Sequence, residues 1–110
     1  MQILFDHCTP APLRHHLPRH TVITAFEQQW HQLKNGVLLT KGEENGFHLL
    51  ITSDRDFTIY EEGMKDRTIA LIVLGSGQWP FIQKRIAQII SAVDAARPGS
   101  YCFIEISPSR

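Results

Sequence analysis

Two aspartates, Asp54 and Asp56, stand one residue apart directly after an apolar run, in the stretch LLITSDRDFT at 49–58. Carboxylates this close repel each other unless something positive lies beside them. An open cluster of carboxylate oxygens suits Mg²⁺ or Mn²⁺ better than zinc. Such an ion can activate water and neutralise charge on a phosphodiester during in-line attack. The spacing therefore points to metal-dependent hydrolysis.

A third carboxylate, Asp6, closes the first apolar run of the chain, Gln2–Phe5. Ligands of parallel sheets bind at the edge where the strands have their carboxyl ends. If the runs that precede Asp6 and Asp54 form neighbouring strands, all three aspartates meet at that edge. An aspartate after a strand can instead cap a turn or helix by accepting from backbone N–H groups. We predict that Asp6, Asp54 and Asp56 are metal ligands and form the catalytic site.

Several polar residues are expected around this site. Asn35 should cap the helix that follows it and supply an outer, weak ligand through its amide oxygen. Arg14, Lys34 and Arg55 are predicted phosphate contacts at the rim, with a solvated position between two acids as the alternative for Arg55. His7 should point to the opposite face from Asp6, because side chains alternate along a strand.

The elements that must position these residues alternate between two types. Strand-like apolar runs occupy 2–5, 20–25, 47–52, 68–74 and 101–106. Helical patterns follow Thr9-Pro10, cover 26–33 and 36–45 with a close at Gly46, form a short helix or turn at 59–64, and open again at Pro80. This alternation indicates a parallel sheet with helices on both faces. We predict one domain over 1–110, an α/β fold built as a three-layer α/β/α sandwich with a mainly parallel sheet of about five strands.

Length and composition set limits on function. A chain of 110 residues with 43% apolar residues can bury one core, and it has no apolar run long enough for a membrane span. The first residues do not read as a signal peptide, and Cys8 and Cys102 lack metal-type spacing, so we expect reduced thiols in the cytoplasm. Net charge is zero, and 43–66 holds seven acids against two basic residues. Contact with phosphates must therefore be local or metal-mediated.

The order of several short motifs resembles the PIN-like superfamily, in particular its small stand-alone proteins of about this length. These motifs are LFDHCTP at 4–10, LKNG at 33–36, GFHLLITSDRDF at 46–57, WP at 79–80 and PGSY at 98–101. The resemblance implies a ribonuclease dependent on Mg²⁺ or Mn²⁺, often the toxin of a toxin–antitoxin pair, with RNA as substrate and an antitoxin or a second copy as partner. Its acids carry over to Asp6, Asp54 and, less directly, Asp56. Many relatives have another acid where this chain has Asn35.

Three other interpretations stay open. Because Asn35 carries no charge and no basic excess attracts RNA, the domain could bind a protein partner or RNA without cleaving it. The stretch DRDFT at 54–58 also fits the signature of haloacid-dehalogenase-like phosphatases, with Asp54 as nucleophile and Asp56 as general acid, but no paired acids follow a later strand. A phospho-receiver domain would use Asp54 and Ser76, yet it needs a lysine after the last strand, where this chain has SPSR.

Overall fold

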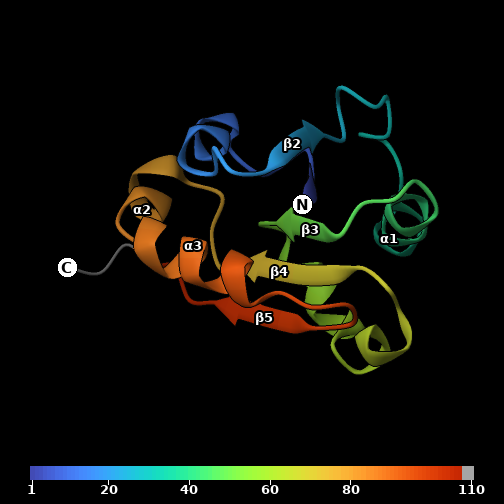
Figure 1. The fold of residues 1–110 in the computed structure, drawn as a ribbon. Helices are drawn as coiled ribbons and strands as arrows, with labels where there is room; N and C mark the ends of the chain where they lie inside the picture. Colours follow the sequence, from blue (N-terminus) through green and yellow to red (C-terminus); the bar gives the residue numbers. More distant parts are fainter. Residues whose placement is uncertain (108–110) are drawn as a thin grey trace.

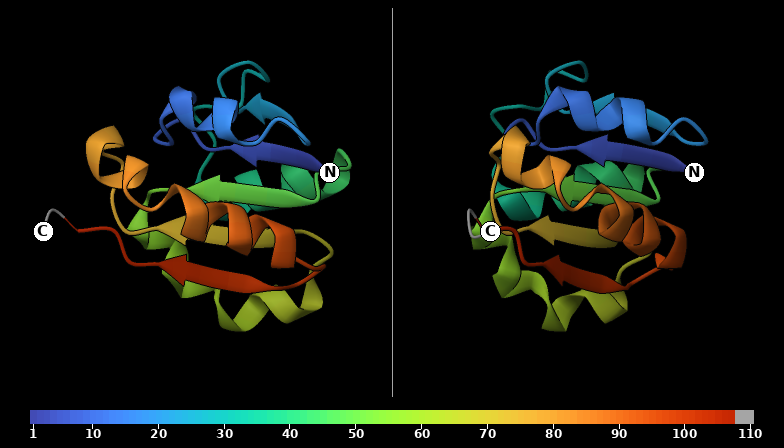
Figure 2. Two further views of the ribbon diagram at one scale, coloured as in Figure 1. Left: turned by 60° about the vertical axis from the view of Figure 1, so that its left-hand side comes forward. Right: turned by 90° about the vertical axis from the view of Figure 1, so that its left-hand side faces the viewer.

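A single sheet of five parallel strands, in the order β2-β1-β3-β4-β5, forms the centre of the computed structural model, which describes residues 1–107 (Figure 1). The strands are β1 (Gln2–Phe5), β2 (Thr21–Thr24), β3 (Leu49–Thr52), β4 (Ala70–Leu74) and β5 (Tyr101–Ile104). Each pair of neighbours is parallel, so all the carboxyl ends lie at one edge of the sheet, at the left in the left-hand view of Figure 2. The predicted α/β fold with a parallel sheet of about five strands is confirmed.

Helices cover both faces of this sheet, which gives three layers (Figures 1 and 2). The helical segments are η1 (Ala11–His16), α1 (Asn35–Glu44), η2 (Arg55–Tyr60), η3 (Glu62–Asp66), α2 (Trp79–Gln83) and α3 (Ile86–Ala95). One core joins the sheet to η1, α2 and α3, and the other joins it to α1, η2 and η3. Alternation along the strands separates the cores, since Ile3 and Phe5 enter the first and Leu4 the second. Burial on both faces explains why the strands read as unbroken apolar runs.

The predicted helix over 26–33 is wrong. The segment is a series of turns, and Gln29 has a φ of 64°, which an α-helix cannot contain. Trp30 and Leu33 nevertheless pack against the core beside α1, while Phe26 stays exposed. The helical spacing of Trp30 and Leu33 therefore reflected core contacts made by an irregular loop.

The long helix predicted from Pro80 is two helices. Ile82, Ile89 and Val93 enter the same core, but the chain breaks between α2 and α3, where Arg85 has φ −119° and ψ 18°. Thr9 does not cap η1: its hydroxyl donates to the carbonyl of Ile51 at 2.9 Å, and η1 begins without a side-chain cap.

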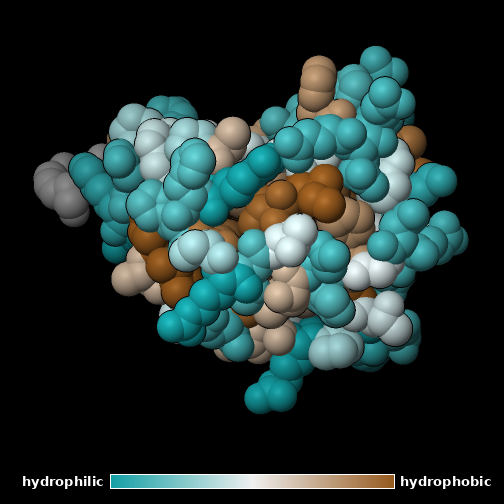
Figure 3. Space-filling model, turned by 45° about the horizontal axis from the view of Figure 1, so that its top comes forward, coloured by the Kyte–Doolittle hydropathy of each residue, from teal (hydrophilic) through white to brown (hydrophobic). Residues whose placement is uncertain are grey.

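One side of the molecule leaves apolar side chains open to solvent. Figure 3 looks onto the side where η1 and β2 face α3 and shows an apolar furrow with polar borders. A hollow of about 400 Å³ lies there, lined by Leu17, Ile90 and polar residues such as His20 and Asp94. Among residues 1–107, no helix has the length and apolar character that crossing a bilayer requires.

Candidate functional site at the β1/β3 edge

The strand order places a topological switch point between β1 and β3. The chain leaves β1 for β2 on one side and later returns as β3 on the other, so the loops after β1 and β3 diverge from neighbouring strand ends. Crevices at such points are where open parallel sheets bind ligands. Asp6 follows β1 there and donates its backbone N–H to Ile51 at 3.0 Å. The first and third strands are therefore neighbours, which was the condition for their aspartates to meet.

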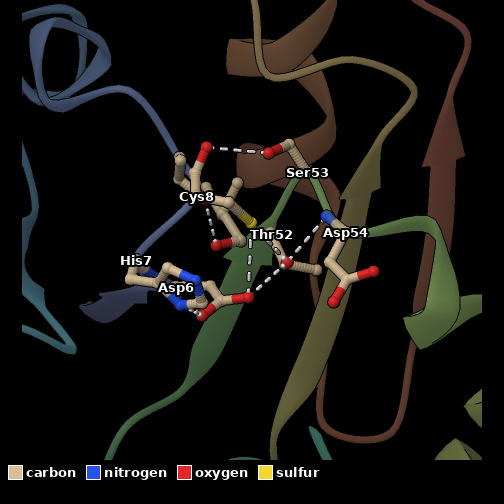
Figure 4. A network of polar contacts seen from close by, with 8 residues as sticks. Asp6, His7, Cys8, Thr52, Ser53 and Asp54 are labelled. Carbon is tan, nitrogen blue, oxygen red and sulfur yellow. Dashed lines mark hydrogen bonds and ion pairs between the residues drawn. The ribbon is translucent and has the colours of Figure 1, made fainter. Parts of the chain in front are cut away.

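Asp6 is a buried carboxylate, 4% exposed, that is fixed from several directions. Its Oδ1 accepts from the backbone N–H of His7 at 2.7 Å and lies 3.1 Å from His7 Nδ1. Its Oδ2 accepts from the hydroxyl of Thr52 at 2.8 Å and from Cys8 Sγ at 3.5 Å (Figure 4). Within the described residues no lysine or arginine pairs with it. Its burial is therefore offset mainly by hydrogen bonds from residues close to it in sequence or space.

His7 does not take its predicted direction. It follows the end of β1 in a turn, where strand alternation no longer applies, and its ring returns to Asp6. Cys8 is held in the same turn, since Ser53 donates to its carbonyl at 2.8 Å. Burial raises the pKa of the Cys8 thiol, and the charge of Asp6 adds to that shift despite opposing hydrogen bonds. Cys8 is therefore a thiol at neutral pH, not an activated nucleophile.

Thr52 joins the two aspartates that the sequence expected to meet. Its fully buried hydroxyl donates to Asp6 Oδ2 and accepts from the backbone N–H of Asp54 at 3.0 Å. Asp6 and Asp54 thus lie on opposite sides of one hydroxyl, as Figure 4 shows. The structure brings these two predicted site residues together.

Asp54 also has the structural role that was its alternative. It caps η2, because its Oδ1 accepts from the backbone N–H of Asp56 at 2.9 Å. Its Oδ2 accepts no hydrogen bond from residues 1–107, so one oxygen remains available. Asp56 lies in the first turn of η2, where its side chain is exposed.

The donor set is sparse for a metal ion. In the part of the chain that the structure describes, no three His, Cys, Asp or Glu side chains are grouped so that they could hold one. Asp6 and Asp54 alone match the one or two carboxylates with which proteins usually bind Mg²⁺, the other ligands being waters and substrate phosphates. A divalent ion at this edge would therefore have at most these two carboxylates as protein ligands and would depend mainly on waters and substrate phosphates.

The other predicted site residues are spread around this edge. Asn35 is the first residue of α1 and not its cap; Lys34 takes that position without a side-chain hydrogen bond. Arg14 binds both carboxylate oxygens of Glu27, at 3.0 and 3.3 Å. Arg14 and Arg55 are both paired with acids of the chain. Of the three predicted phosphate contacts, the exposed Lys34 is therefore the one with no acidic partner among residues 1–107.

Arg55 is held over the ends of β4 and β5. Its Nε donates to the carbonyl of Gly75 at 3.1 Å, and its guanidinium carbon lies 5.2 Å from the ring centre of Phe103. A terminal nitrogen lies 3.9 Å from a carboxylate oxygen of Glu105. The side chain is therefore directed away from Asp6.

A hollow of about 510 Å³ opens beside Asp6 that the sequence did not predict. Its lining includes Asp6, His7, Thr24, Phe26 and Trp79. The sequence indicated this hollow only through the positions of His7 and Phe26, which each follow shortly after a strand end.

Comparison with known proteins finds no matching family, and neither a curated protein nor a solved structure matches this chain. The PIN-like resemblance therefore stays a prediction from the sequence motifs.

Proposed function

We propose that this chain is a PIN-like ribonuclease that hydrolyses RNA phosphodiester bonds, with Mg²⁺ or Mn²⁺ bound by Asp6 and Asp54. The observation that supports it is that the Thr52 hydroxyl contacts both the Asp6 carboxylate and the backbone N–H of Asp54, which brings these two residues to the switch point of a parallel sheet. RNA as substrate and an antitoxin protein as partner come from the resemblance. We also propose a cytoplasmic location, in keeping with the free thiols of Cys8 and Cys102.

Different residues of the chain would have different roles at such a site. His7, Cys8 and Thr52 hold the Asp6 carboxylate in one orientation, and Asp54 Oδ2 accepts no hydrogen bond from residues 1–107, since the backbone N–H of Asp56 bonds to Oδ1. A bound divalent ion would supply an activated water and neutralise charge on the phosphodiester. Asp56 and Asn35, at the starts of η2 and α1, are assigned outer positions as weaker ligands. Lys34 is the predicted cation that remains free to contact phosphate.

A binding role without cleavage is the second candidate. It is favoured by the lack of a three-residue metal group in residues 1–107 and by the pairing of Arg14 and Arg55 with acids of the chain itself. In that case the same edge would hold a protein partner or RNA and leave it intact. The two candidates differ in metal binding and in RNA cleavage, and both can be measured.

The substitution Asp54→Asn separates these candidates. Asparagine also caps helices, so the fold should persist, whereas Mn²⁺-dependent RNA cleavage should fall by about a hundredfold or more, as when one key electrostatic group of an active site is lost. Melting temperature with increasing Mn²⁺ should rise for the wild type, because an ion that binds only the folded state stabilises it, and should stay constant for Asp54→Asn.

The matched control is Asp66→Asn, which removes one exposed carboxylate from η3. This variant should cleave RNA and respond to Mn²⁺ like the wild type. Full activity in carefully purified Asp54→Asn would contradict the assignment. Absence of both cleavage and any Mn²⁺ response in the wild type would decide for the binding role.

A further inference from the structure

The hollow beside Asp6 has an aromatic side chain that folding does not require. Phe26 follows β2 at the carboxyl edge of the sheet, and it is 67% exposed. Burial of a phenylalanine side chain stabilises a fold, and Phe26 gains little of this because most of its surface stays in solvent. Its ring stacks at a tilt on His31, with 4.6 Å between ring centres, and it lines the hollow.

A second aromatic residue lines the same space from a different layer of the molecule. Trp79 begins α2 and is partly buried against the first core, so its position is fixed. Its ring lies 5.7 Å from that of His16. Two aromatic side chains from segments distant in sequence thus line the same hollow as Asp6.

The polar groups of the hollow are few and can form hydrogen bonds. His7 and Thr24 are in its lining together with Asp6. No lysine or arginine lines it among the described residues, so a bound anion would find no cation there. A volume of about 510 Å³ lies within the range of small-molecule sites, and a largely apolar lining with a few polar groups is typical of them. This chemistry suits a flat, uncharged ring with polar edges.

We propose that this hollow is a nucleobase subsite, in which one unpaired base of an RNA strand stacks on Phe26 with its polar edge near His7 and Thr24. Proteins that hold single-stranded nucleic acids commonly stack bases on aromatic side chains, and this stacking contributes to affinity separately from the contacts that charged groups make with the backbone. The inference rests on the proposed function in one respect: the phosphodiester next to the bound base would lie at Asp6. Stacking itself needs no metal ion.

Binding without metal tests this subsite. A short single-stranded adenylate RNA is titrated in EDTA against the wild type and against Phe26→Ala, with fluorescence anisotropy of the labelled RNA as the readout. Loss of one stacking contact should weaken binding by about tenfold. The slope of log affinity against log salt should not change, because no phosphate contact is removed. Phe26→Trp should restore wild-type affinity.

The control is Ile59→Ala, which removes another exposed apolar side chain, 76% exposed, from η2. It should bind like the wild type, and an abasic ribose-phosphate strand should not distinguish Phe26→Ala from the wild type. Equal affinity of wild type and Phe26→Ala for the adenylate strand, or no measurable binding by the wild type, would overturn the subsite. RNA cleavage by wild type and Asp54→Asn is scored separately, so the subsite and the nuclease can fail independently.

Discussion

The Asp6 carboxylate shows how one buried charge can be set in place by its own chain segment. His7 and Cys8 follow it directly, and Thr52 reaches it from the neighbouring strand. The sequence predicted that Asp6 and Asp54 would meet, because both follow apolar runs that end at the same edge. It could not predict the link between them, since a threonine at the end of a strand reads simply as a β-branched strand residue.

Thr52→Val tests this link at nearly constant volume. Valine cannot donate to Asp6 or accept from the backbone N–H of Asp54, so a buried carboxylate and a partly buried N–H lose a partner. We expect the free energy of unfolding to fall by about 1–3 kcal/mol, measured by urea denaturation. Thr58→Val is the control, because the Thr58 hydroxyl also donates a hydrogen bond, to the backbone carbonyl of Arg55 at 2.8 Å, but is exposed. Similar losses in both variants would show that the Thr52 hydroxyl has no special role.

At the scale of elements, the strands were more predictable than the helices. A strand buried on both faces needs only a short apolar run between polar ends, and β4 (Ala70–Leu74) is such a run. Helical spacing is less reliable, because any loop that dips into a core can show it, as 26–33 does. The site residues differ in predictability in the same way. The positions of Asp6 and Asp54 are fixed by strand ends, whereas those of Asp56 and Asn35 depend on where η2 and α1 begin.

Helix α1 ends at Glu44, and Gly46 closes it in the left-handed conformation as predicted; two glycines test why. Gly46 has a φ of 82°, and an added Cβ there would meet no atom within 4 Å, so strain alone should decide the effect. Gly46→Ala should lower the free energy of unfolding by about 1–2 kcal/mol. Gly63, inside η3, has equally open space without a positive φ, and Gly63→Ala should be neutral or stabilise by up to about 1 kcal/mol. Urea midpoints measure both, and equal effects of the two changes would refute the explanation.

At the scale of the whole molecule, the sheet separates two cores that must be held against it from both sides. On the α1 side, Glu43 makes a polar connection between layers. Its Oε1 accepts from Arg67 at 2.8 Å, and its Oε2 accepts from the backbone N–H of Thr68 at 2.6 Å, just before β4. Both side chains of the ion pair are mostly buried, at 19% and 23% exposed. Glu43 therefore fastens the end of α1 to the sheet.

This connection predicts how stability depends on pH. Burial on its own would raise the pKa of Glu43, but the hydrogen bonds from Thr68 and Arg67 and the charge of Arg67 outweigh it and lower the pKa below the ordinary 4.5. A carboxyl with a depressed pKa in the folded state stabilises the fold above its unfolded pKa and loses that contribution as pH falls through the folded one. The difference in free energy of unfolding between wild type and Glu43→Gln, measured by urea denaturation, should hence be constant near neutrality and shrink below pH 4.5. Glu44→Gln, at the exposed neighbouring position, should follow the wild-type profile. A difference for Glu43→Gln that persists unchanged at low pH would mean that the carboxylate charge does not hold α1 to the sheet.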